Sequence, residues 1–124
     1  MTDTADAPPP YDAVLARILI LASDDYTHLG YVWQAVREGG VPAGQELGPG
    51  LECIRRLLAD GMVLLGGWAD GIWEGTADEL VARVGELASE LGRLPSEVDQ
   101  PYLLATTAGE RAAESLAARG ERDH

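Results

Sequence analysis

The sequence predicts one α+β domain in which three helices precede a β-hairpin and further helices follow it. Three observations support this fold class. Apolar residues recur at helical spacing in several segments. Two short apolar stretches flank an Asp-Gly step, which is a hairpin signal. The length of 124 residues, with 46% apolar and 24% charged residues, is typical of a single globular domain.

The first two helices are predicted from their apolar stripes. Over residues 12–23 the apolar side chains repeat at i, i+1, i+4, i+5 and i+8, and the acidic pair at 24–25 ends the segment. A second helix is expected over residues 28–38, with Thr27 as its N-cap. The glycine pair at 39–40 is expected to stop it.

A loop rich in Gly and Pro, residues 39–50, separates the second helix from the third. Pro49 fits the first turn of the third helix, and Gly61 fits its end. The hairpin is then expected to pair strands 62–65 and 72–74 around the Asp-Gly step. An all-helical fold, with this stretch as an irregular loop, is the main alternative.

Two capping boxes are predicted in the C-terminal half. A Thr-x-x-Glu pattern beginning at Thr76 opens a fourth helix that ends near Leu91. A short strand is expected over residues 102–106. A second Thr-x-x-Glu pattern, beginning at Thr107, then opens a terminal helix over residues 108–119.

The domain is expected to span residues 11–119. Residues 1–10 are small, polar and proline-rich, which predicts a disordered leader, and the polar residues 120–124 predict a frayed tail. The N-terminus lacks the basic and apolar regions of a signal peptide, and the apolar runs are too short to cross a bilayer. We therefore expect a cytoplasmic protein without a membrane span.

Two short motifs resemble those of winged-helix proteins. Residues 57–63, LLADGMV, are similar to the junction between a recognition helix and a wing. Residues 104–110, LATTAGE, are similar to a strand-to-helix step in MarR-like and PadR-like regulators. The resemblance covers residues 12–118 and implies a winged-helix fold. It also implies that the third helix enters the DNA major groove while the wing contacts the DNA backbone or the minor groove.

The charge balance opposes that DNA-binding role. The chain has 21 acidic residues and nine basic ones, all arginine, for a net charge of −12. The absence of lysine, with abundant Ala and Gly, suggests a bacterial genome of high GC content. Residues 24–75 contain eight acidic residues and only three basic ones, Arg37, Arg55 and Arg56. These three arginines are the candidate DNA-binding residues. Phosphate contacts depend on such cations, so DNA binding is not expected to be the main activity.

Catalytic and metal-binding groups are sparse. Cys53 is the single cysteine and is expected to be a buried small apolar residue. His28 stands at the expected start of the second helix, without a serine in a nucleophile-elbow context. The sequence thus predicts neither an enzyme nor a cofactor or metal site.

The aromatic residues suggest a binding surface. Trp68 is expected at the tip of the hairpin, where an exposed tryptophan is a candidate hot spot. Trp73 and Ile72 point to opposite faces of a strand, so one layer cannot bury both. With Asp70 and Glu74, the two tryptophans are the candidate partner-binding residues.

The leading hypothesis is an acidic, non-catalytic protein–protein interaction module, monomeric or homodimeric, whose partner has a basic surface. An immunity or antitoxin-like inhibitor of a basic protein is its concrete form. The alternative is a winged-helix transcriptional regulator that binds DNA as a dimer. A third hypothesis is a structural subunit whose acidic surface only keeps it soluble.

Overall fold

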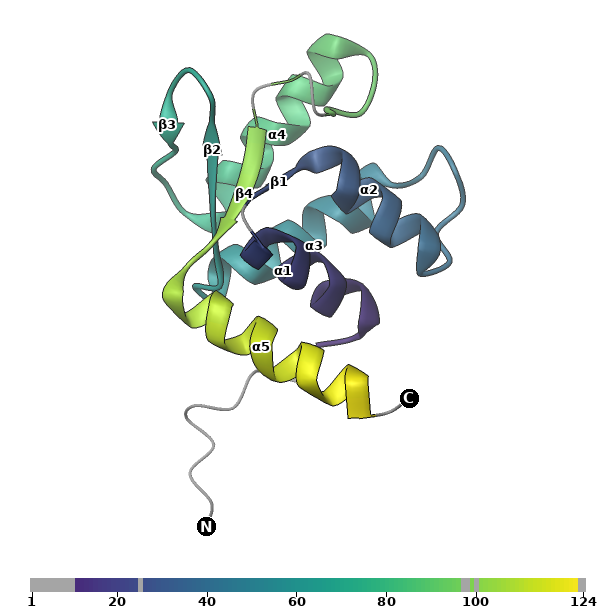
Figure 1. Ribbon diagram of the computed structural model, residues 1–124. Helices are drawn as coiled ribbons and strands as arrows, with labels where there is room; N and C mark the ends of the chain where they lie inside the picture. The colour runs from purple at the N-terminus through teal and green to yellow at the C-terminus, as the bar shows by residue number, and fades with distance from the viewer. Residues whose placement is uncertain (1–10, 25, 97–98, 100, 123–124) are drawn as a thin grey trace.

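The computed structural model describes residues 11–24, 26–96, 99 and 101–122 (Figure 1). The expected leader, residues 1–10, and the last two residues of the expected tail lie outside this part. The described chain is an α+β fold of five helices and a four-stranded antiparallel sheet. In order, the elements are α1 (Ala13–Asp24), β1 (Thr27–His28), α2 (Leu29–Glu38), α3 (Leu47–Ala59), β2 (Val63–Gly67), β3 (Gly71–Ile72), α4 (Ala77–Leu91), β4 (Pro101–Ala105) and α5 (Thr107–Arg122).

The sheet joins distant parts of the chain in the order β1-β4-β2-β3. The central pair is β2 with β4, which runs from Val63 opposite Ala105 to Gly67 opposite Pro101. Strand β1 adds two residues on the other side of β4, and β3 adds two residues beside β2. Figure 1 shows α1, α2 and α3 grouped on one side of this sheet, with α5 near one end of β4.

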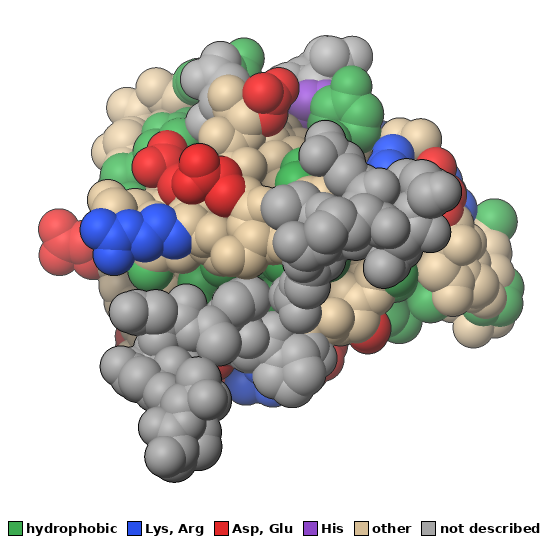
Figure 2. Space-filling model, turned by 60° about the horizontal axis from the view of Figure 1, so that its bottom comes forward, with side chains coloured by type: hydrophobic (Ala, Val, Ile, Leu, Met, Phe, Trp, Pro, Cys, Tyr) green, Lys and Arg blue, Asp and Glu red, His purple; other side chains and the backbone are tan. Residues whose placement is uncertain are grey.

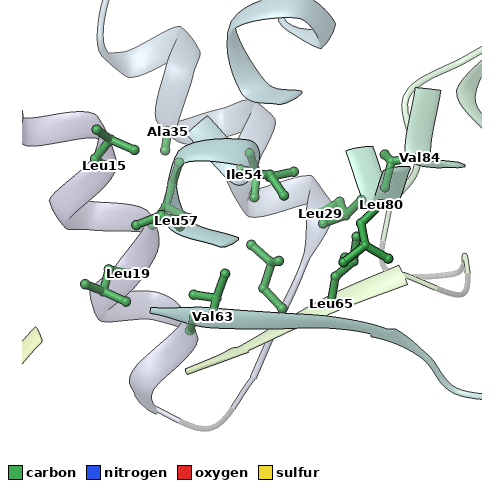
Figure 3. Packing of buried hydrophobic residues seen from close by; sticks show 14 of the residues in the cluster. Leu15, Leu19, Leu29, Ala35, Ile54, Leu57, Val63, Leu65, Leu80 and Val84 are labelled. Carbon is green, nitrogen blue, oxygen red and sulfur yellow. The ribbon is translucent and has the colours of Figure 1, made fainter. Parts of the chain in front are cut away.

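The hydrophobic core lies between the sheet and these helices. Val63 and Leu65 lie on the helix side of β2, as Figure 3 shows, and neither is more than 2% exposed. Ile18 of α1 and Ile54 of α3 are fully buried in the same cluster. Burial of such side chains stabilises a domain by about 1.5–3 kcal/mol each.

Trp33 lies in the core and also fixes the loop that follows α4. Its side chain is buried, and its indole N–H donates to the Pro95 carbonyl at 2.7 Å. Asp99 accepts from the Ser96 backbone N–H at 2.7 Å and pairs with Arg93 at 2.8 Å. The Trp33 hydrogen bond therefore joins the segment after α4 to α2. Within that segment, the Asp99 carboxylate joins Ser96 to Arg93.

The predicted helices are all present, and the first capping box is confirmed. Thr76 accepts from the Glu79 backbone N–H at 3.1 Å, and the Glu79 carboxylate accepts from the Thr76 N–H at 2.8 Å. Helix α4 ends at Gly92, which has a left-handed φ of 70°. Pro49 lies in the first turn of α3, although that helix begins at Leu47, earlier than expected.

Two predicted caps are wrong by one residue each. Thr27 belongs to β1, and His28 is the N-cap of α2, because its Nδ1 atom accepts from the Gly30 N–H at 3.1 Å. Thr106 rather than Thr107 caps α5, since its hydroxyl oxygen accepts from the Gly109 N–H at 3.0 Å. Strand pairing accounts for both differences. Pairing of β1 with β4 keeps Thr27 and His28 extended, and pairing of β4 with β2 ends at Ala105, just before Thr106.

The hairpin is present but smaller than predicted. Only Gly66 and Gly67 of β2 are paired with β3, and the second strand ends at Ile72 rather than at residue 74. Gly71 has a left-handed φ of 75°, which glycine adopts without steric cost. The main partner of β2 is instead β4, so the sheet depends on a contact between distant segments. None of the described helices is long and apolar enough to cross a membrane.

Candidate functional site

The pairing of the strands places one row of side chains across the outer face of the sheet. His28 lies opposite Tyr102, Tyr102 opposite Gly66, and Gly66 opposite Ile72. Directly opposed residues of an antiparallel pair point to the same side. By the same rule Leu64 points outward beside this row, whereas its neighbours in β2 point into the core.

Three aromatic rings form a cluster at one end of this row. Trp68 and Tyr102 have ring centroids 4.5 Å apart, and the Tyr26 ring meets Trp68 edge-on at 4.9 Å. Tyr26 and Tyr102 are 6.2 Å apart. Edge-on and tilted arrangements at these distances are favourable for aromatic pairs. The cluster therefore holds Trp68 in place rather than leaving it free at the turn.

Tyr31 extends this surface onto the first turn of α2. Its ring lies 4.6 Å from the ring of His28, whose backbone is paired with Tyr102. We use the term outer face for Tyr26, Tyr31, Leu64, Trp68, Ile72 and Tyr102.

The outer face gathers the exposed apolar side chains of the described chain. The large hydrophobic residues that remain exposed there are Tyr26 (45%), Tyr31 (44%), Leu64 (39%), Trp68 (54%) and Ile72 (42%). All of them belong to the outer face, and Tyr102 beside them is half-buried. Isolated exposed apolar residues are ordinary, but a contiguous group marks a candidate interaction site.

The predicted partner-binding residues are divided between two sides of the hairpin. Trp68 is part of the outer face, and Glu74 is exposed just after β3. Trp73 is only 7% exposed and contributes to the core, so it offers little surface to a partner in the free chain. Asp70 is half exposed in the turn and pairs with Arg83 of α4 at 3.0 Å.

Trp73 is covered by a cation from α4. The guanidinium carbon of Arg83 lies 3.7 Å from the centroid of the Trp73 ring. The turn and α4 together enclose a hollow of about 540 Å³. Its lining residues are Asp70, Trp73, Arg83, Glu86, Leu87, Ser89 and Glu90.

The four strands of the sheet contain no charged residue. Acidic residues lie near their ends in the sequence: Asp24 and Glu74 are exposed, and Asp70 in the turn is paired with Arg83 of α4. Figure 2 shows another face of the molecule, on which patches of acidic side chains lie near the few arginines. The strands of the outer face are thus uncharged, and acidic residues flank them in the sequence.

Each arginine proposed for DNA contact forms an ion pair with an acid. Arg37 pairs with the buried Glu46 at 3.1 Å. In α3, Arg55 pairs with Glu52, and the next residue, Arg56, pairs with an acid one turn further along. A phosphate would have to compete with these carboxylates, which weakens the case for a DNA surface on α3.

The Glu46 and Asp99 carboxylates are held in their charged forms. Hydrogen bonds from its own backbone N–H, from Gly44 and from Arg37 lower the pKa of Glu46. The hydrogen bond from Arg93, aided by Ser96, lowers the pKa of Asp99. Both carboxylates fasten loops through hydrogen bonds to backbone N–H groups and arginines, so we assign them a structural role.

The described residues bring no catalytic set together. No group of three or more His, Cys, Asp or Glu side chains among them could hold a metal ion. Burial raises the pKa of the Cys53 thiol to about 11, so the thiol stays protonated and is a poor nucleophile at neutral pH. His28 uses Nδ1 as a helix cap.

Searches of protein-family models, curated proteins and solved structures find no match for this chain.

Proposed function

We propose that this chain is a non-catalytic module that binds a protein partner through the outer face. One observation carries the proposal. The large exposed hydrophobic side chains of the described residues gather on one side of the sheet, while the other side is packed against helices. A single-domain protein gains no folding stability from leaving such a group in water.

The composition of the outer face fits a binding hot spot. Tryptophan and tyrosine are enriched among residues that contribute most to protein–protein affinity. Trp68 is the most exposed of them, yet Tyr26 and Tyr102 already restrain its ring. A restrained aromatic side chain loses little conformational entropy on binding, which favours affinity.

The acidic residues near the strand ends suggest the chemistry of the partner. We propose a folded protein whose docking surface has an apolar centre surrounded by arginine or lysine side chains. Such a surface complements the acids next to the strands and the net charge of −12. Attraction of this kind accelerates association and falls with salt. An immunity or antitoxin-like inhibitor of a basic protein is the concrete form of this proposal.

A winged-helix scaffold remains part of the proposal at the level of fold. Helices α1, α2 and α3 followed by the β2–β3 hairpin support it. A regulator that binds DNA through α3 is less well supported, because Arg37, Arg55 and Arg56 are each paired with an acid. In our proposal the scaffold binds protein with its sheet instead of DNA with its helix.

The proposal is tested by comparative capture from native lysate at about 150 mM salt, with and without nuclease treatment. The baits are the full chain, its Trp68→Ala variant and its Arg17→Ala variant. Arg17 is a control because it is about half exposed on α1 and away from the sheet. All three baits are first shown to have the same melting temperature and circular dichroism.

The expected result is a basic protein that the full chain and Arg17→Ala retain after nuclease treatment. Loss of Trp68 is expected to weaken its binding by about 30-fold or more, as for a hot-spot residue. Equal retention by Trp68→Ala would contradict the proposal. So would recovery of DNA alone, or a self-association that sedimentation shows to be lost in Trp68→Ala.

A further inference from the structure

The hollow between the hairpin turn and α4 already contains one cation. Arg83 covers the ring of Trp73 and donates to the Asp70 carboxylate at 3.0 Å. A guanidinium over a tryptophan ring is attracted by the negative face of the ring. Arg83 and Asp70 are each about half exposed, so their pair is weakened by water and can open at little cost.

The lining carries more negative charge than Arg83 neutralises. Glu86 and Glu90 also line the hollow, and neither forms an ion pair with a described residue. They are four residues apart on α4 and so share one side of the helix, where like charges repel. A second positive group in the hollow would relieve that repulsion.

Trp73 supplies an independent sign that the hollow takes a ligand. Its side chain lines the hollow, is 93% buried, and its indole N–H has no acceptor among the described residues. Buried donors are nearly always satisfied in native proteins. The Nε1 atom is closed to solvent in the free chain, so an acceptor oxygen reaches it only when the side chains that cover the ring move aside.

We infer that the hollow receives an arginine side chain of the protein partner, which displaces Arg83 from Trp73 and Asp70. Its guanidinium meets the acidic lining, and its backbone carbonyl offers an acceptor to the indole N–H. Arginine fits better than lysine, because a planar guanidinium stacks on the ring as Arg83 does. The inference rests on the proposed function only in assigning this arginine to a protein.

The turn connects the two sites. Trp68, on the outer face, and Asp70, on the hollow, are two residues apart in the loop between β2 and β3. A partner that covers Trp68 therefore passes close to the hollow. The arginine contact would make the complex selective for a basic side chain at one defined place.

The test uses N-acetyl-arginine N-methylamide, titrated into the isotopically labelled full chain. The readout is the NMR signal of the Trp73 indole N–H, assigned by its absence in Trp73→Phe. We expect a saturable shift, with binding about threefold tighter in Arg83→Ala, where the competing cation is removed. Arg83→Gln serves as a second variant, and Arg55→Ala is the control that should match the parent chain.

Two outcomes would overturn the inference. One is a Trp73 signal that does not move in either Arg83 variant at about 100 mM probe, a concentration that detects very weak sites. The other is an equal shift with N-acetyl-norleucine N-methylamide, which lacks the charge. Asp70→Asn in the Arg83→Ala background is expected to weaken binding, and an unchanged affinity would also contradict the inference.

Failure here is distinct from failure of the proposed function. Trp68→Ala removes the main anchor of the outer face but leaves the lining of the hollow intact. The probe titration should therefore be unchanged in that variant, while capture of the partner is lost. If the probe fails and capture still depends on Trp68, only the arginine contact is wrong.

Discussion

The two faces of the sheet differ far more in their surroundings than in their residues. Leu64 and Leu65 are adjacent leucines of β2, yet Leu64 is 39% exposed on the outer face and Leu65 is fully buried. The inner face contacts α1 and α3 and contributes to the core (Figure 3). The outer face also bears large apolar side chains, and these remain exposed.

This difference separates stability from binding. Side chains of the inner face lose their contacts with water when the domain folds, so they account for the folding free energy. Side chains of the outer face remain hydrated in the free chain. Their burial becomes favourable only when a partner covers them, and it then contributes to the free energy of binding. Substitutions on the two faces should therefore affect different measurements.

The largest effect is expected for Leu65→Ala. Removing a fully buried leucine leaves a cavity and should lower the free energy of unfolding by about 2–5 kcal/mol. Leu64→Ala is the matched control, with an expected cost under about 1 kcal/mol because its side chain is 39% exposed. Urea denaturation of both variants measures the difference. Equal losses would show that the outer face is covered in the free protein.

The junction of α5 with the sheet should be nearly as sensitive. A Cβ atom on Gly109 would collide with the Met62 carbonyl oxygen, so Gly109→Ala should cost about 1–3 kcal/mol or more. Gly85 of α4 is the control, since its added Cβ would lie 3.7 Å from Leu51 in ordinary contact. Gly85→Ala should instead stabilise the protein by about 0.5–1 kcal/mol. Thermal unfolding measures both variants. If Gly109→Ala and Gly85→Ala changed the melting temperature in the same direction, the result would contradict this packing.

The inner face was largely predictable from the sequence, because it follows local periodicity. Apolar spacing located the helices, and the Thr76 capping box located the start of α4. The outer face was not predictable in the same way. It is assembled by β1 and β4 from distant segments, and short strands carry weak local signals.

The residues of the candidate site were also only partly predictable from the sequence. Trp68 could be selected because it lies in the predicted turn between two strands. Tyr26, Tyr31 and Tyr102 were not selected, since nothing local places them beside Trp68. Alternation in β4 contains a partial signal, because Tyr102 and Leu104 flank the buried Leu103. Only the register between β1, β4 and β2 joins these residues into one surface.

A smaller effect should appear where β4 leaves the sheet. The Thr106 hydroxyl donates to the Gly61 carbonyl at 2.6 Å and accepts from the Gly109 N–H, which links α5 to the start of β2. Thr106→Ala should lower the free energy of unfolding by about 1 kcal/mol, the usual cost of losing a cap. Thr107→Ala should be nearly neutral. The reverse order in urea denaturation would restore Thr107 as the cap.

The smallest effect concerns pH, and it also separates the faces. The pKa of Glu46 is lowered from its ordinary value of 4.5 by its hydrogen bonds, so its contribution to stability is complete above that value. That contribution is lost as the pH falls through the lower pKa of the folded state, and Asp99 acts in the same direction. Urea midpoints measured from pH 7 down to about pH 3 should therefore begin to fall below about pH 4.5.

The Glu46→Gln variant should begin with a lower midpoint at pH 7 and lose less on acidification, because the titrating group is absent. Trp68→Ala should follow the parent curve throughout, since its side chain belongs to the outer face and contacts neither carboxylate. A Trp68→Ala curve that departed from the parent only at low pH would mean that the outer face is coupled to these loops. It would then contribute to folding as well as to binding, and the separation between the two faces would no longer hold.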